Sequence, residues 1–330
     1  MIILCADTRT IATMDVSDVA ARYLRFAEME ARERSPLYAE ISRGIAADSE
    51  VLGFLLTLAP EKQQPNLLLA AVRHLFGTPQ DWHGFRDTLL ANRDAVAALM
   101  QSRSTQTNEP ARCAVLLPLL ARLPQPLALI EVGASAGLCL LPDHYGYDYG
   151  HAVLSGEPMF RCAANAATPI PRSLPHIAWR AGLDLNPVDL SDGEQVAWLE
   201  TLVWPEQTER LANLRSAIKI TAAIRPRVVR GDLLGDSFVR LCREAPKNAT
   251  LVIFHSAVLA YVPNRSEREA FAARAMQRGT WISNEMPGVF PDIAKRAPAR
   301  GPVGRFLLSM DGAPVAWTEP HGAALEWIAA

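Results

Sequence analysis

Ionisable side chains follow several short apolar runs in this sequence, a position from which they can contact a ligand. Five residues share this position: Glu131, Asp184, Asp232, His255 and Glu285. Four of them are carboxylates, and none is a lysine or an arginine. Because clustered carboxylates repel phosphate and favour cations and sugar hydroxyls, the set predicts a site for a cationic ligand or a ribose diol.

Residues 127–141 read LALIEVGASAGLCLL and contain the first of these acids, Glu131. The apolar run that ends in this carboxylate is typical of a buried parallel strand. Five small residues follow, and Gly133 and Gly137 allow the backbone to turn sharply and to lie within contact distance of a ligand. We expect a helix to begin at Leu138. The turn lacks the motifs of a P-loop and of a nicotinamide dinucleotide site.

The elements that position these residues alternate between strand and helix after residue 125. Apolar runs predict strands at residues 127–132, 180–184, 227–232, 250–256 and 279–285. Two further strands, at 304–310 and 314–319, flank Asp311-Gly312, a strong hairpin signal. The fold class we predict is α/β: a Rossmann-like, doubly wound, mostly parallel sheet with a C-terminal antiparallel hairpin.

Residues 1–112 are expected to form an N-terminal helical domain or lid, since strand signals are scarce there. Ser35 is a candidate N-cap, with Pro36 at the first helical position. Residues 113–330 are expected to form the second domain. The polar run at 103–112, RSTQTNEPAR, is either a solvated linker or a segment that hangs over the ligand site. Four of its residues are candidate ligand contacts: Gln106, Thr107, Asn108 and Glu109.

Residues 143–178 are expected to form an insertion in the second domain. Tyr145, Tyr147 and Tyr149 alternate with small or polar residues. This alternation predicts a strand, with which residues 159–163 could form a hairpin. The three tyrosines, with Trp179 and Trp204, could line an aromatic pocket for a small-molecule substrate, although core packing is the preferred explanation for the two tryptophans.

Composition excludes several classes of function. The 330 residues include 33 basic and 35 acidic side chains, for a formal net charge of -2, so no nucleic-acid partner is expected. The five cysteines are scattered and odd in number, so they predict neither a disulfide framework nor a structural zinc site. Because no disulfides are predicted, a reducing cytoplasm is the expected location. The histidines lack metal-ligand spacing. The first residues, MIILCADTRT, lack the features of a signal peptide, and no run of about 18 apolar residues predicts a membrane span.

Three motifs together resemble those of class I S-adenosylmethionine-dependent methyltransferases. They are Glu131-x-Gly133-x-x-x-Gly137, an acid after the second strand and Gly231-Asp232 after the third. The resemblance covers residues 127–320 and implies S-adenosylmethionine as the cofactor, a ligand with an ammonium, a sulfonium and a ribose diol but no phosphate.

The resemblance also implies roles for particular residues. The glycine turn, with Gly133, Ala134, Ser135 and Gly137, would make room for the methionine part beside Glu131. Asp184, with Asn186, would hold the ribose hydroxyls, and Asp232, with Leu233, would bind near the adenine amino group. Asp148 is the alternative ribose residue, because the second acid in related nucleotide-binding folds follows the first by about twenty residues.

Catalysis by such an enzyme needs positioning and, for an oxygen nucleophile, a base. His255 is the candidate base, and Ser256, Tyr261 and Asn284 could orient the acceptor. His255 is equally interpreted as a core histidine. Substrate contacts are expected from Gln106, Asn108, Tyr147 and Glu285.

Two other functions remain open at this point. Gly-Ala-Ser-Ala-Gly matches the nucleophile elbow of serine hydrolases, with Ser135 as the nucleophile and with Asp232 or Asp292 and His321 in the required order. The second alternative is a methyltransferase-like fold that binds a nucleoside without catalysing a reaction.

Over nearly its full length the chain also resembles an uncharacterised bacterial family, domain of unknown function 2332. Its resembling segments are residues 35–38, 106–109, 131–138, 184–189, 204–207 and 254–261.

Overall fold

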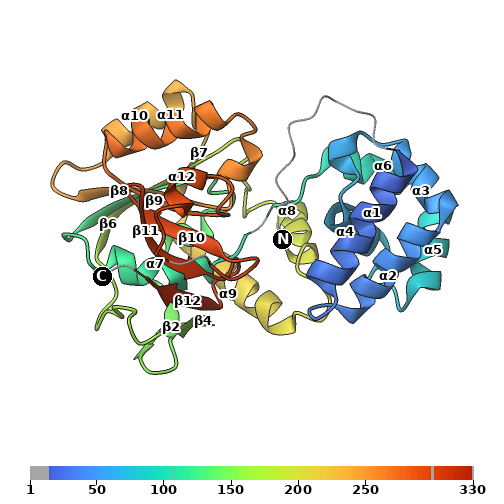
Figure 1. Ribbon diagram of the computed structural model, residues 1–330, viewed down its shortest axis with the longest axis horizontal. Helices are drawn as coiled ribbons and strands as arrows, with labels where there is room; N and C mark the ends of the chain where they lie inside the picture. Colours follow the sequence, from blue (N-terminus) through green and yellow to red (C-terminus); the bar gives the residue numbers. More distant parts are fainter. Residues whose placement is uncertain (1–14, 107, 299–300, 329–330) are drawn as a thin grey trace. The chain divides into compact units, whose positions relative to one another are not determined.

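The computed structural model describes residues 15–106, 108–298 and 301–328, so Cys5 and Thr107 lie outside the described residues. The chain divides into two compact units (Figure 1). The first contains residues 15–106 together with Asp192–Ala212, and the second contains Asn108–Ser191 and the chain from Asn213 onward. From the sequence we expected a single boundary at residue 112, with residues 192–212 in the second domain.

The described residues of the first unit form helices and no strand. Its elements are α1 (Val16–Phe26), η1 (Ala27–Ala31), α2 (Pro36–Ala47), α3 (Ser49–Leu56), η2 (Pro60–Lys62), α4 (Pro65–Phe76), α5 (Trp82–Ala91), α6 (Arg93–Ser102) and α8 (Gly193–Thr201), and α9 (Thr208–Ile224) begins here. The predicted N-cap is confirmed, because the Ser35 side chain accepts a hydrogen bond from the Tyr38 N–H and Pro36 is the first helical residue.

Two tryptophans explain why residues 192–212 belong to the helical unit. Trp198 and Trp204 are buried in its core. The Trp198 indole donates to the Ser104 carbonyl at 3.0 Å, and the Trp204 indole donates to the Asn66 side-chain oxygen at 2.9 Å. Burying these large rings with their N–H groups paired stabilises the segment on the first unit.

The second unit is built on a nine-stranded, mostly parallel sheet with the order β5-β12-β11-β10-β9-β8-β1-β6-β7. The strands are β1 (Leu127–Val132), β5 (Ala163–Ala164), β6 (Ile177–Asp184), β7 (Arg227–Arg230), β8 (Thr250–Ser256), β9 (Thr280–Glu285), β10 (Phe306–Met310), β11 (Ala313–Thr318) and β12 (Ala324–Trp327). The five from β9 to β7 run parallel, whereas β10, β11 and β12 pair antiparallel.

The C-terminal hairpin is confirmed. Met310 of β10 pairs with Ala313 of β11, and only Asp311 and Gly312 lie between them. Both turn residues have positive φ, 49° and 74°, as the tightest hairpin turns require. The short strands β5 and β12 were not predicted.

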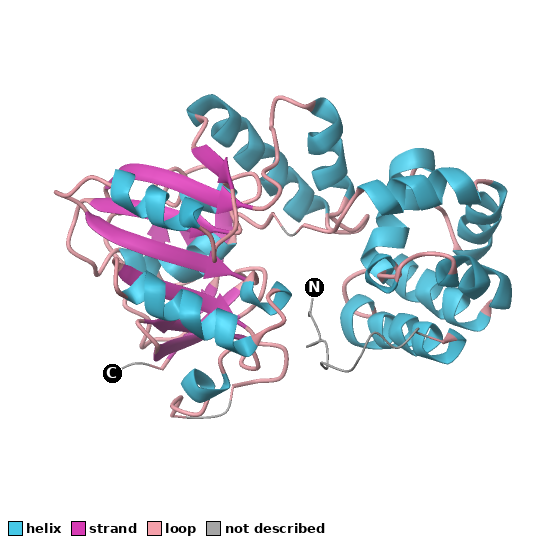
Figure 2. Ribbon diagram, turned by 90° about the horizontal axis from the view of Figure 1, so that it is seen from above, coloured by secondary structure: helices cyan, strands magenta, loops and turns pink. Residues whose placement is uncertain are grey.

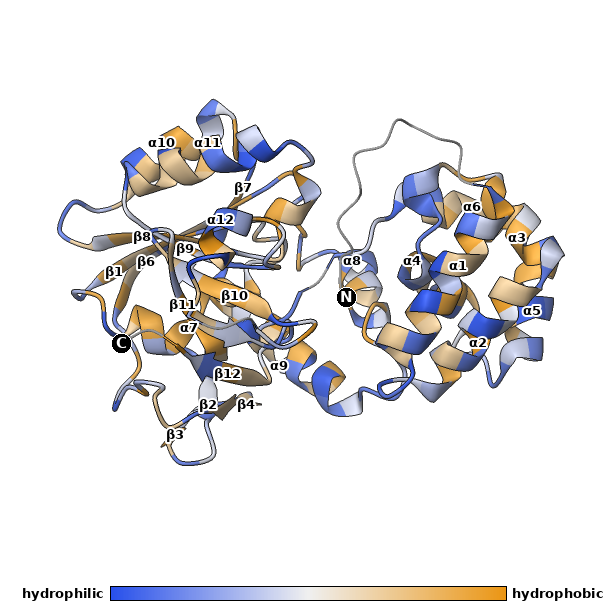
Figure 3. Ribbon diagram, in the orientation of Figure 1, coloured by the Kyte–Doolittle hydropathy of each residue, from blue (hydrophilic) through white to orange (hydrophobic). Residues whose placement is uncertain are grey.

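Helices cover both faces of the sheet (Figures 1 and 2). One face packs Leu129 and Val252 against α7 (Arg112–Leu120) and the second half of α9. The other face packs Ile130 and Ile253 against three helices, α10 (Asp236–Glu244), α11 (Arg265–Met276) and α12 (Pro291–Ala294). Successive residues of β1 and β8 therefore enter different cores, which is why residues 127–130 and 251–254 are continuous apolar runs (Figure 3).

The connection from β1 to β6 differs from the prediction. Only the single turn η3 (Leu138–Leu140) follows the small residues, where a helix was expected. A three-stranded sheet of β2 (Gly146–Asp148), β3 (Val153–Leu154) and β4 (Met159–Arg161) makes the rest of the crossover. Strands β2 and β4 pair parallel, so the predicted hairpin between them is wrong.

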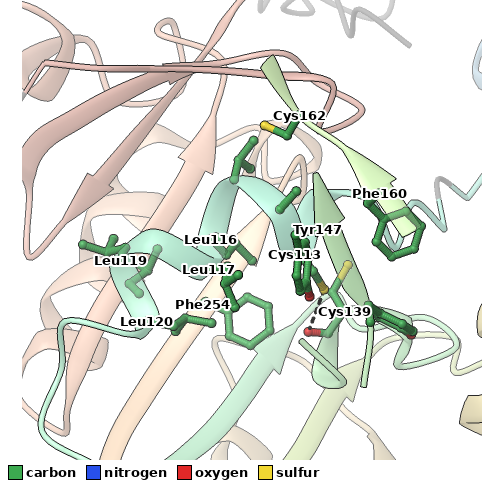
Figure 4. Close-up of a cluster of buried hydrophobic side chains, with 14 of the residues drawn as sticks. Cys113, Leu116, Leu117, Leu119, Leu120, Cys139, Tyr147, Phe160, Cys162 and Phe254 are labelled. Atoms are coloured by element: carbon green, nitrogen blue, oxygen red, sulfur yellow. Dashed lines mark hydrogen bonds between the residues drawn. The ribbon is translucent and has the colours of Figure 1, made fainter. Parts of the chain in front are cut away.

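The tyrosines of this small sheet are core residues. Tyr145, Tyr147 and Tyr149 are buried, and their hydroxyls donate to the Leu138, Pro142 and Ala114 carbonyls at 2.7–2.8 Å. Figure 4 shows Tyr147 in one cluster with the leucines of α7 and Phe254 of β8. Burial raises the pKa of the Tyr147 hydroxyl well above its ordinary value. These tyrosines were expected to line a substrate pocket, and the structure instead places all three in the hydrophobic core.

Within the described part of the chain, no helix is both long enough and apolar enough to cross a membrane.

Candidate functional site

The order of the parallel strands reverses at β1. From β1 the chain continues to β6 and β7 on one side, and β8 and β9 lie on the other. Open α/β sheets bind ligands at the carboxyl ends of the strands beside such a reversal. Glu131 lies one residue before the end of β1, and Asp184, Ser256 and Glu285 are the last residues of β6, β8 and β9.

Glu131 is a buried carboxyl group with an unfilled hydrogen-bonding position. Its side chain is 7% exposed, and Oε2 has no hydrogen-bond partner among the described residues. Burial raises the pKa of the Glu131 carboxyl well above its ordinary value, and the nearby Arg112 charge opposes this rise. A buried carboxylate without a partner is costly, so burial favours the neutral carboxyl group and leaves Oε2 without a hydrogen-bond partner among the described residues.

The glycine turn has the sharp backbone that the sequence predicted. Gly133, Ser135 and Gly137 have φ values of 74°, 49° and 73°. A Cβ atom on Gly133 would lie 2.3 Å from Val258 Cγ2, and one on Gly137 would lie 3.2 Å from Val228 Cγ2. The turn and contacts within the protein therefore account for both glycines.

Two polar side chains hold this turn in place. The Asp184 carboxylate accepts from the Ser135 N–H at 2.8 Å and from the Asn186 N–H at 2.7 Å. Asn108 donates to Ser135 Oγ at 3.0 Å and accepts from the Ala136 N–H at 3.2 Å. Asn108 therefore lies over the turn, whereas Gln106 belongs to the first unit.

Arg112 also lies at this edge of the sheet, although the sequence did not indicate it. It is 6% exposed, and it donates from Nε to the Pro320 carbonyl at 2.8 Å and from Nη1 to the Ser256 carbonyl at 3.0 Å. The five residues chosen from their positions after apolar runs therefore did not include this buried basic side chain. Its only sequence signal was its place at the start of the apolar helix α7, where an arginine must find buried partners.

His255 is buried and has a partner at each ring nitrogen. Nδ1 lies 2.7 Å from Glu285 Oε1, and Nε2 accepts from the Trp281 indole at 3.1 Å. These partners assign the proton to Nδ1. The interpretation of His255 as a core histidine describes this geometry.

Glu285 organises the turn that follows β8. Its Oε1 also accepts from the Val258 N–H at 2.8 Å and the Leu259 N–H at 3.0 Å, which opens η4 (Leu259–Tyr261). Its Oε2 has no partner among the described residues, and the side chain is 3% exposed. Tyr261, at the end of this turn, is 54% exposed.

The other predicted residues lie near the same edge or in the core. Asn284 donates to Ser256 Oγ at 2.9 Å and accepts from Thr318 Oγ1 at 2.7 Å. Asp232 follows β7 and accepts from the Leu234 N–H at 2.8 Å, with Leu233 between them. Tyr147 is in the core, as described above.

The residues of the hydrolase alternative are only partly brought together. Ser135 has the positive φ of a strained turn, but only the single 3-10 turn η3 follows it, where a nucleophile elbow requires an α-helix. His321 Nδ1 lies 3.6 Å from Glu109 Oε2, and Asp292 pairs with Arg265 and Lys295. In the described ranges, no group of three or more histidines, cysteines and acids is arranged to hold a metal ion.

Comparisons with known proteins identify a family. No curated protein and no solved structure matches the chain. The family model described as an uncharacterized protein conserved in bacteria, DUF2332, matches residues 20–327. Because this match covers nearly the whole sequence, the chain belongs to the DUF2332 family.

Proposed function

We propose that the second unit binds S-adenosylmethionine at the carboxyl ends of β1, β6, β7 and β8 and transfers its methyl group to a small molecule. Glu131 carries this proposal. It combines burial, an oxygen without a partner and a place beside the reversal of strand order. A positively charged nucleoside would offset the cost of burying this carboxylate.

The other acids suit the remaining parts of this ligand. The Asp184 oxygens each accept one backbone N–H, which fixes the carboxylate and leaves lone pairs for ribose hydroxyls. The rival residue, Asp148, lies in the small sheet and accepts from the Gly150 N–H. Contact between Asp184 and the glycine turn supports Asp184 as the ribose residue. Asp232 remains available to accept from the adenine amino group.

In the transfer step, the acceptor atom would bond to the methyl carbon as the carbon–sulfur bond breaks. The electron pair of that bond would go to sulfur, and a proton on the acceptor would go to solvent. The chain contributes mainly position and charge: carboxylates hold the cationic ligand, and the turn after β8 presents the exposed Tyr261 to the acceptor. Both ring nitrogens of His255 are already hydrogen-bonded within the protein, so we propose that His255 positions Glu285 and this turn and does not act as the base.

Calorimetric titration with S-adenosylmethionine and S-adenosylhomocysteine tests the proposal. We expect wild-type protein to bind both, Asp184→Ala and Asp232→Ala to lose at least about tenfold in affinity, a difference of about 1.4 kcal/mol, and Asp148→Ala to keep wild-type affinity. No binding by the wild type would refute the proposal. Unchanged affinity in the first two variants would remove the site assignment.

A serine hydrolase is the second candidate, and the positive φ of Ser135 favours it. A fluorophosphonate probe tests it directly. Labelling of the wild type and not of Ser135→Ala would support a hydrolase and reverse the ranking. Affinity for S-adenosylhomocysteine without methyl transfer to any acceptor would instead indicate a non-catalytic nucleoside-binding protein.

A further inference from the structure

Ser135, in the glycine turn, is held by hydrogen bonds from three different segments of the chain. Its N–H donates to the Asp184 carboxylate at 2.8 Å, and its carbonyl accepts from the Val188 N–H at 3.1 Å. The Asn108 amide donates to its Oγ at 3.0 Å and accepts from the next N–H, that of Ala136, at 3.2 Å. Ser135 is therefore a point at which distant segments meet.

Two of these segments are connections between the two compact units. Among the described residues, the chain leaves the first unit before Asn108, returns to it at Asp192 and leaves it again after Ala212. Asn108 lies at the first crossing, and Val188 lies in the loop that leads to the second. The third crossing lies within α9, a continuous helix whose hydrogen bonds fix its length. Both connections that are not helical are therefore bonded to Ser135.

The first connection is also anchored in the first unit, a few residues before Asn108. The Ser104 carbonyl accepts from the Trp198 indole at 3.0 Å, and the Thr105 hydroxyl donates to the Gln64 side-chain oxygen at 3.1 Å. From Thr105 to Asn108 the chain advances three residues, which can span at most about 11 Å. This connection can take up only a small change before it pulls on the turn.

The second connection has a similar pair of anchors. Val188 is bonded to Ser135, and Asp192 caps α8 in the first unit by accepting from the Glu194 N–H at 2.9 Å. The four residue steps from Val188 to Asp192 can span at most about 14 Å. A change at Ser135 is therefore felt at the start of α8 as well.

The backbone of Ser135 supplies the two conformations that coupling requires. Its φ of 49° is left-handed, a conformation that a residue other than glycine keeps only when its surroundings impose it. If the bonds to Asn108 or Val188 are lost, Ser135 can relax to an ordinary backbone conformation. Gly133 and Gly137 have positive φ without this strain.

We propose that Ser135 and Asn108 couple the glycine turn to both connections, so that the conformation of the turn and the order of the two connections change together. A ligand that binds to the turn in its strained conformation would stabilise both connections at a distance from its own contacts. The inference goes beyond the proposed function, because the coupling is present whichever ligand binds. Ser135 is in this account a positioning residue.

Hydrogen exchange of the ligand-free chain tests the coupling. Asn108→Ala removes two hydrogen bonds from the turn, and we expect it to speed exchange of the Val188 amide by about tenfold, because the turn opens more easily. A merely local role for Asn108 would speed exchange only within residues 108–112 and 133–137. An unchanged Val188 amide would overturn the inference. Ser135→Ala, which removes only the hydroxyl, decides by the same criterion if Asn108→Ala does not fold.

Asn165 provides the matched control. Its amide also bridges main-chain groups, since it donates to the Trp327 carbonyl and accepts from the Trp327 N–H, both at 3.0 Å. Asn165→Ala should leave exchange of the Val188 amide unchanged. Equal acceleration in the two asparagine variants would show a general loss of stability and would also overturn the coupling.

The same measurement with saturating S-adenosylhomocysteine examines the effect of a ligand, and this experiment alone rests on the proposed function. We expect slower exchange at residues 133–137 and, in parallel, at the Val188 amide. Protection of the turn without protection of Val188 would contradict the coupling. If the ligand does not bind, the proposed function fails, while the ligand-free comparison still decides the coupling.

Discussion

Substituting Gly133 with alanine tests how the glycine turn packs against the turn after β8. The new Cβ would lie 2.3 Å from Val258 Cγ2, at a residue whose φ is 74°. The left-handed backbone costs a non-glycine residue about 1–2 kcal/mol, and overpacking adds about 1–3 kcal/mol. We therefore expect Gly133→Ala to lower the free energy of unfolding by about 2–5 kcal/mol in urea denaturation followed by circular dichroism.

Gly150 provides the matched control for the backbone part of this cost. Its φ is 83°, but a Cβ there would meet no atom within 4 Å. Gly150→Ala should therefore lose only about 1–2 kcal/mol. Adding Val258→Ala should remove most of the steric cost of Gly133→Ala and leave the backbone cost. Equal losses in the two glycine variants would show that Val258 does not press on Gly133, and would refute this packing.

Three further predictions concern buried polar groups. Burial raises the folded-state pKa of Glu131, so the contribution of this carboxyl to stability is present below its unfolded pKa and is lost as pH rises through its folded pKa. Between these two pKa values the free energy of unfolding should fall by about 1.4 kcal/mol for each pH unit, and Glu131→Gln should remove this fall. Urea denaturation at pH 5 and pH 8 would measure it, and a variant less stable than the wild type at pH 8 would contradict it. Tyr147→Phe leaves the buried Pro142 carbonyl unpaired and should lower the free energy of unfolding by about 1–3 kcal/mol, with no change in affinity for S-adenosylhomocysteine. A large loss of affinity would instead show that Tyr147 contacts the ligand. His255→Phe removes a hydrogen-bond partner from the buried Glu285 and should lower the free energy of unfolding by roughly 3 kcal/mol in the same denaturation assay. Unchanged stability would mean that His255 does not hold Glu285 in place.

Much of the strand pattern could be predicted because β1 and β8 bury both faces and so leave continuous apolar runs in the sequence. The hairpin at Asp311-Gly312 and the cap at Ser35 were predictable because local backbone chemistry determines them. The helix after Gly137 was mispredicted: Leu138, Leu140 and Leu141 have helical spacing, but the chain makes one turn and then enters the small sheet.

The parts that sequence could not reveal depend on distant contacts. Trp198 and Trp204 carry residues 192–212 into the first unit through hydrogen bonds to Ser104 and Asn66, about 94 and 138 residues away along the chain. Arg112 reaches the site because it binds the Pro320 carbonyl, 208 residues later. No local pattern encodes such pairings.

Some residues of the candidate site could be predicted from their position along the chain, whereas their contacts with distant residues could not. Position at a strand end identified Glu131, Asp184 and Glu285, since the carboxyl ends of parallel strands meet at one edge. Strand position could not show that Trp281 and Glu285 occupy both nitrogens of His255, because these partners come from the neighbouring strand.

Hydrogen exchange with and without S-adenosylhomocysteine, read by mass spectrometry, tests the central claim most directly, because it locates the ligand on the chain. We predict slower exchange at residues 131–137 and 256–261 and no change in the small sheet at residues 146–161. Unchanged exchange at 131–137 under saturating ligand, or protection confined to the small sheet, would contradict the claim that the edge beside Glu131 is the ligand site.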